Sequence, residues 1–157
     1  MKRVLLWLFP DEFMRNPAYF RGIALAGLYV ALLLSQLFTF EKFAEVTLGF
    51  GFPGGLATAW IVAVIIPLIE LAALPYLISM RLPAWVRNVS YWCVLAVPVL
   101  WLVILLWQLL SSSASQLNAG IFGATLTTAL GPWLIVFGVI MFWAAVLVAR
   151  ELPRRRD

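Results

Sequence analysis

The chain has 157 residues, of which 64% are hydrophobic and only 11% are charged. The surface of a soluble domain could not cover so much apolar material, so the composition excludes a water-soluble globular protein. The net charge of +4 does not indicate nucleic-acid binding, because the basic residues lie beside apolar stretches and not along a segment that could follow phosphates. We therefore expect one integral membrane domain over residues 1–157.

Four apolar stretches are long enough to cross a lipid bilayer. A helix needs roughly 20 apolar residues to cross a hydrocarbon core about 30 Å thick. The predicted spans are residues 20–38, 56–80, 89–110 and 128–149. Together they predict an all-α protein, a four-helix transmembrane bundle.

The first residues resemble a signal peptide only superficially. Lys2 and Arg3 precede an apolar run over residues 4–9, but the run is short and Pro10 ends it without a cleavage site of small residues. We expect a short, uncleaved segment that lies on the cytoplasmic surface of the membrane.

The positions of the basic residues predict the orientation of the bundle. Short cytoplasmic loops retain Lys and Arg during insertion. Apart from Lys42, all the basic residues lie before or at the very start of the first span, between the second and the third, or after the fourth. This pattern places both termini in the cytoplasm and residues 39–55 and 111–127 on the outer face. The basic C-terminal run, from Arg150 to Arg156, would hold anionic lipid headgroups.

The second span carries a single charged residue, Glu70, with Pro67 and Pro75 nearby. A charge at a helix centre costs roughly 2.5 to 3.5 kcal/mol on insertion scales, which the surrounding apolar residues offset. A protonated Glu70 could donate to a carbonyl that a proline leaves free. Two roles stay equally open for this candidate site: a neutral hydrogen bond between helices, or a site for a proton, a quinone or another ligand.

Three prolines lie inside predicted helices: Pro67, Pro75 and Pro98. Each removes a backbone donor and frees the carbonyl four residues earlier, which for Pro98 is that of Val94. Such carbonyls need another donor inside a membrane. We expect these prolines to be tolerated only where another group satisfies the freed carbonyl.

Two glycines, Gly131 and Gly138, are seven residues apart in the predicted fourth span. This spacing places both on one helix face. They would let a neighbouring helix approach closely.

The two predicted outer loops hold the remaining candidate residues. Glu41 and Glu45 would share a helical face beside Lys42, an arrangement that favours a solvated surface over a cation site or a partner contact. In the second loop, the glycines of residues 118–123 indicate a tight turn at the membrane surface. Its candidate residues are Asn118, Gly120, Phe122 and Gly123.

Three short motifs, in order along the chain, resemble the DoxX and MauE superfamily of four-span membrane proteins. Residues 40–43 read Phe-Glu-Lys-Phe and place Lys42 where the family has a lysine near the end of its first helix. Residues 66–71 contain the Pro-x-x-Glu-Leu of the second helix, and residues 118–123 resemble the MauE outer loop Cys-Gly-Cys-Phe-Gly. In that alignment Ala119 and Ile121 occupy the two cysteine positions.

The resemblance implies redox-associated work at the outer face of a bacterial inner membrane. MauE is linked to the maturation of a periplasmic, disulfide-rich dehydrogenase subunit, and DoxX relatives are linked to quinone-dependent sulfur oxidation. This chain has Cys93 as its single cysteine and no histidine. A dithiol needs two cysteines, so thiol exchange within this chain is excluded, as is histidine-based metal, haem or acid–base chemistry.

These observations favour a non-catalytic accessory protein of the DoxX/MauE type. It would stabilise, or help to assemble or mature, a membrane or periplasmic redox complex, with the lipid bilayer and other membrane subunits as its partners. We expect no catalytic residue, no metal site and no resident cofactor. The alternative is a protein that binds or transfers a quinone, a lipid or a proton through Glu70.

Overall fold

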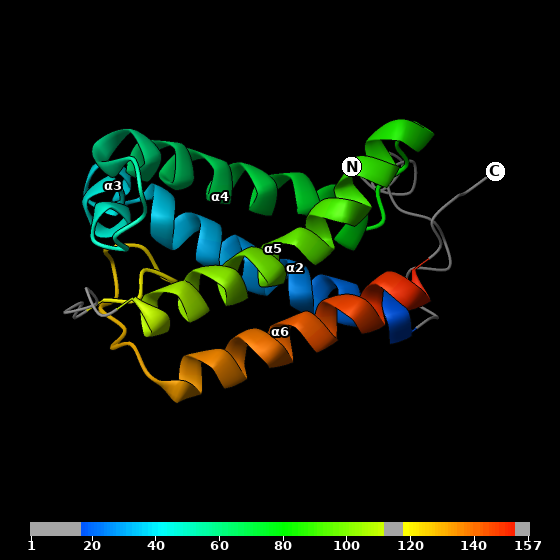
Figure 1. The fold of residues 1–157 in the computed structure, drawn as a ribbon. Coiled ribbons are helices and arrows are strands. Elements are labelled where there is room, and N and C mark those ends of the chain that lie inside the picture. Colours follow the sequence, from blue (N-terminus) through cyan, green and yellow to red (C-terminus); the bar gives the residue numbers. More distant parts are fainter. Residues whose placement is uncertain (1–16, 112–117, 153–157) are drawn as a thin grey trace.

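The computed structural model describes residues 17–111 and 118–152, and the regular secondary structure in these two ranges is entirely helical. Four long helices run side by side (Figure 1), and these are α2 (Pro17–Leu37), α4 (Gly55–Leu77), α5 (Ala84–Leu110) and α6 (Pro132–Glu151). A short helix, α3 (Phe40–Leu48), packs against α4 at one end of the bundle. The predicted all-α, four-helix bundle is confirmed.

The four long helices have the length and composition of membrane spans. The shortest, α6, has 20 residues and is about 30 Å long at a rise of about 1.5 Å per residue. Each helix exposes large apolar side chains, and Phe20, Leu68, Val103 and Ile140 are all more than half exposed. The helices are therefore long and apolar enough to cross a membrane, as predicted.

The start of α2 and the end of α6 lie at the same end of the bundle (Figure 1). An ion pair between Arg21 and Glu151 joins them, and the Tyr76 hydroxyl on α4 donates to the Leu152 carbonyl over 2.8 Å. We call this the basal end. The opposite end, which holds α3 and residues 118–131, is called the cap end. The predicted interfacial segment and most of the predicted basic C-terminal run lie outside the described residues, and the membrane side that each end faces stays a prediction.

The helices pack in the order α2, α4, α5, α6, and a smaller contact between α2 and α6 completes the bundle. Two glycines allow close approach. A Cβ atom on Gly22 of α2 would lie 2.6 Å from the Leu77 carbonyl oxygen of α4, and one on Gly138 of α6 would lie 2.7 Å from Leu102 Cδ2 of α5. The prediction for Gly138 is confirmed. Gly131 does not share this role, because it is the extended residue that caps the N-terminus of α6.

Several helix ends differ from the ends of the predicted spans. Helix α4 ends at Leu77 and not near residue 80, because Ser79 adopts a φ of 52° that no helix can continue. Helix α5 begins at Ala84 and not near residue 89, and it includes Arg87, which was expected in a loop and is buried. Helix α6 begins four residues after the predicted start, at Pro132. At these positions the limits of the apolar stretches and the limits of the helical backbone do not coincide.

The carbonyl that Pro98 frees in α5 receives a donor from another helix. The Tyr29 hydroxyl of α2 donates to the Val94 carbonyl over 2.8 Å, and both residues are completely buried. A carbonyl without a donor is costly in a membrane, so this bond stabilises the proline-containing helix. The expectation that another group satisfies this carbonyl is confirmed, and the group belongs to a neighbouring helix.

The Ser90 hydroxyl of α5 also hydrogen-bonds to the backbone of α4 near Pro75. The Tyr76 amide donates to Ser90 Oγ over 2.9 Å, and Ser90 Oγ donates to the Ala73 carbonyl over 3.3 Å. All three bonded residues are buried. Ser90 therefore adds hydrogen bonds to the α4 backbone on both sides of Pro75.

Candidate functional site

Glu70 lies at the junction of three helices and is only 1% exposed. Its Oε1 atom accepts a hydrogen bond from Trp101 Nε1 of α5 over 3.1 Å and another from Gln36 Nε2 of α2 over 3.2 Å. We call Glu70, Gln36 and Trp101 the Glu70 cluster. Among the described residues, the hydrogen bonds of Glu70 run to these side chains and not to a carbonyl freed by a proline.

The position of Glu70 follows from the buried face of α4. Glu70 belongs to a series with helical spacing whose other members are small or apolar, and these are Ala59, Ala63, Ile66, Pro67, Ala73 and Leu77. Residues three, four and seven apart share one face of a helix, so Glu70 points into the bundle. Pro67 belongs to the same buried face, whereas Pro75 is only half-buried. Both prolines lie within α4, and the hydrogen bonds of the Glu70 carboxyl run to Gln36 and Trp101.

Gln36 connects the Glu70 cluster to the loop at the cap end. Its side chain is completely buried, and Nε2 also donates to the Ile121 carbonyl over 3.3 Å. A second buried amide acts in parallel, because Gln108 Nε2 of α5 donates to the Ala119 carbonyl over 3.3 Å. Two glutamines on different helices thus hold carbonyls two residues apart in the same loop.

The loop over residues 118–131, which we call the cap loop, is organised around Asn118. Its Nδ2 donates to the Gly123 carbonyl over 2.9 Å, while Oδ1 accepts from the amides of Gly120 and Thr128 over 3.0 and 3.2 Å. The Ala119 amide also donates to the Thr128 carbonyl over 2.7 Å. These bonds close the tight turn that the sequence predicted for this segment.

Both glycines of the turn have a backbone that favours glycine. Gly120 has a φ of 79° and Gly123 a φ of 59°. A Cβ atom on Gly123 would also lie 2.9 Å from the Ser35 carbonyl oxygen of α2. Gly123 therefore lets the cap loop touch the α2 backbone, and the neighbouring Phe122 packs half-buried against the core.

Ala119 and Ile121, which occupy the cysteine positions of the MauE-like motif, are 0% and 1% exposed. Their carbonyls receive the two glutamine bonds described above. Cys93 is half-buried on α5 and carries a free thiol. In the described ranges, no three His, Cys, Asp or Glu side chains are grouped so that they could hold a metal ion.

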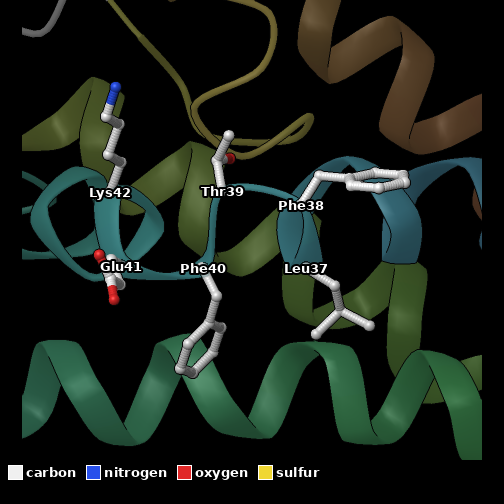
Figure 2. A pocket seen from close by; sticks show the side chains of 6 residues that line it. All are labelled: Leu37, Phe38, Thr39, Phe40, Glu41 and Lys42. Atoms are coloured by element: carbon white, nitrogen blue, oxygen red, sulfur yellow. The ribbon is translucent and has the colours of Figure 1, made fainter.

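The acidic pair of the first outer loop is not part of the Glu70 cluster. Glu41, Lys42 and Glu45 are all exposed on α3, as the preferred interpretation of a solvated face predicts. A surface pocket of about 530 Å³ lies beside them and is lined by residues 37–42. Figure 2 shows that its side chains diverge, because Lys42 and Thr39 point to one side, while Phe40 and Glu41 point to the other.

Five buried side-chain polar atoms have no hydrogen-bond partner within residues 17–111 and 118–152. Two are the hydroxyls of Ser79 and Ser111, and the other three are Glu70 Oε2, Gln36 Oε1 and Gln108 Oε1. Each of these three belongs to a side chain that already uses its other polar atom. Around Glu70, Gln36 and Gln108 the unsatisfied atoms are therefore oxygens that need donors, so a ligand bound there would have to donate hydrogen bonds.

The sequence interpretation found Glu70 but missed Gln36, Gln108 and Trp101. A usable signal was present, because Gln36 and Gln108 are the two amide side chains within the four predicted spans. Polar side chains inside a membrane tend to hydrogen-bond across helices. That rule would have made Gln36 and Gln108 candidates for contact with Glu70 or with a buried backbone.

No protein-family model, no curated protein and no solved structure matches this chain. The resemblance to the DoxX and MauE superfamily therefore stays a prediction that depends on its three motifs.

Proposed function

We propose that this protein is a non-catalytic, DoxX/MauE-like accessory protein of a bacterial inner membrane. It stabilises, or helps to assemble or mature, a membrane or periplasmic redox complex. One observation carries the proposal: Oε1 of the internal acid accepts hydrogen bonds from two other helices, and Gln36 extends this contact to the cap loop. Glu70 acts here as a structural connector.

The outer surface of the helices supports a role among other membrane subunits. Large apolar side chains are exposed on every long helix, including the aromatic residues Trp60, Trp107 and Trp143. Such faces are suited to lipid or to the helices of partner subunits, where packing and not water exclusion drives association. The cap loop would present its exposed residues to a partner on the outer side.

Extraction from the native membrane in a mild detergent, followed by native mass spectrometry, tests this proposal. We expect a stoichiometric set of partner subunits to remain bound to the chain. A lone monomer or homodimer that carries a quinone or a lipid would contradict the accessory role.

Two substitutions of Glu70 separate the accessory role from its alternative. Glu70→Gln retains the hydrogen bonds and removes titration, whereas Glu70→Leu removes both. If Glu70 is structural, assembly of the complex fails in Glu70→Leu and is preserved in Glu70→Gln. Glu41→Gln is the matched control, because it makes the same change at an exposed position on α3.

The second candidate function is the binding or transfer of a small molecule or a proton through Glu70. One observation favours it: Oε2 is buried and has no donor in the described part of the chain. This function predicts that Glu70→Gln assembles normally but loses transport or redox activity. Normal activity in an assembled Glu70→Gln complex would refute it.

A further inference from the structure

Two of the donor-free acceptors belong to side chains that already touch each other. Gln36 Nε2 lies 3.2 Å from Glu70 Oε1, while Gln36 Oε1 and Glu70 Oε2 have no donor in the described ranges. The two groups are planar and of similar shape. A carboxylic acid and a primary amide can pair through two parallel hydrogen bonds, one in each direction. The first of these bonds is present in the structure.

The orientation of the Gln36 amide is fixed by its surroundings. Its Nε2 faces two acceptors, Glu70 Oε1 and the Ile121 carbonyl. A flipped amide would point its oxygen at both and lose both hydrogen bonds. Gln36 Oε1 is therefore the atom that needs a donor.

The nearby donors are already used. Trp101 Nε1 donates to Glu70 Oε1, and the Tyr29 hydroxyl donates to the Val94 carbonyl. Tyr29, on α2, and Trp101, on α5, are both neutral donors. Glu70 makes no ion pair with a Lys or Arg of the described ranges, and the ion pair between Arg21 and Glu151 lies at the basal end.

An ionised Glu70 would thus be a buried charge without a counter-ion, and both its Oε2 atom and the Oε1 atom of its partner Gln36 would lack a donor. Both features are unfavourable in a site of low polarity. A single proton removes both problems, since it neutralises the carboxyl and supplies the missing donor.

We propose that Glu70 is a proton-binding site in which the bound proton, on Oε2, is donated to Gln36 Oε1 and completes a two-bond acid–amide pair. The proton comes from water, and its binding leaves Oε1 free to accept from Gln36 and Trp101. This inference does not depend on the accessory role, and it deepens the second candidate function by naming the atom that holds the proton. It adds that proton binding at Glu70 controls how firmly the Gln36 side chain is held. Because Gln36 also bonds to the Ile121 carbonyl, proton binding then affects the attachment of the cap loop.

Infrared spectroscopy of the wild-type protein in lipid vesicles at neutral pH tests the proposal directly. A protonated carboxyl group has a carbonyl stretch that is distinct from the bands of a carboxylate and shifts in heavy water. We expect this band in the wild type and in Glu41→Gln, and its loss in Glu70→Gln. Gln36→Leu should retain the band at a shifted frequency, because the acid loses its amide partner.

The proposal is overturned if the wild type shows only carboxylate bands at neutral pH, or if the acid band persists in Glu70→Gln. A second measurement needs no variant. Wild-type protein labelled with ¹³C at the glutamate side-chain carboxyls should give one carboxyl resonance with the chemical shift of a neutral acid at neutral pH. If all the labelled carboxyls have the shift of an ionised group, the proposal fails whether or not the variants fold.

Discussion

Replacing Gln36 by Leu should destabilise the bundle, because it removes hydrogen bonds at the Glu70 cluster without opening a large cavity. The substitution keeps a side chain of similar size but removes the bonds of Nε2 to Glu70 and to the Ile121 carbonyl. Hydrogen bonds between membrane helices contribute on average about 0.6 kcal/mol and at most about 1.7 kcal/mol. Leaving the buried Ile121 carbonyl without a partner adds roughly 1 to 3 kcal/mol.

The expected loss in free energy of unfolding is therefore about 2 to 4 kcal/mol. Gln108→Leu is the matched control, because it removes one amide bond to the same loop, at Ala119, and should cost about half as much. Reversible unfolding in mixed micelles, with increasing amounts of a denaturing detergent, measures both. Proteolysis at the cap loop should accelerate in the same order.

Equal stability of Gln36→Leu and the wild type, within about 0.5 kcal/mol, would refute the reasoning, since surface-like substitutions fall in that range. A double-mutant cycle with Glu70→Leu refines the result. If Gln36 and Glu70 act as one pair, the two losses should not add, and the coupling energy should exceed about 0.5 kcal/mol. Additive losses would mean that Gln36 acts through Ile121 alone.

Three further predictions concern other parts of the molecule. Gly123→Ala should loosen the cap loop by roughly 1 kcal/mol or more, because φ is 59° there, and faster amide hydrogen exchange in residues 118–131 would report it. Tyr29→Phe leaves the Val94 carbonyl without its donor and should lower the free energy of unfolding by about 1 to 3 kcal/mol in the micelle assay, whereas an unchanged value would contradict the role of this bond. Lys42→Cys, in a Cys93→Ala background, should react with a membrane-impermeant thiol reagent added outside intact spheroplasts, and labelling only after lysis would reverse the predicted orientation.

The bundle was predictable from the sequence because its strongest signal is local. Each span needs only enough consecutive apolar residues, and Glu70 was recognisable because it interrupts one of them. The helix ends were less predictable, because hydropathy measures transfer into lipid and not backbone geometry. Met80 is apolar, so hydropathy extends the predicted span to it. The helix nevertheless ends at Leu77, and Ser79 has a left-handed backbone conformation.

The partners of Glu70 were not predictable by the same means. Gln36 and Trp101 are 34 and 31 residues away along the chain, and no periodicity within a single helix encodes such a pairing. Gln36 was identifiable as an unusual residue in a span, but its second bond depends on how the cap loop folds back onto α2. Gly131 was misassigned for a related reason, since its spacing from Gly138 predicts a shared face only if both lie in one helix.

The hydroxyls of Tyr29 and Ser90 have a consequence for how the protein is made. Each supplies a hydrogen bond at or near a proline in another helix, Tyr29 to α5 and Ser90 to α4. A span that entered lipid by itself would expose those backbone groups to hydrocarbon, at a cost of several kcal/mol each. Helices α4 and α5 therefore gain from entering the bilayer together, with α2 already beside them. Insertion and helix association in this chain would then be one coupled event, and a biogenesis factor that retains early spans until later ones emerge would speed it.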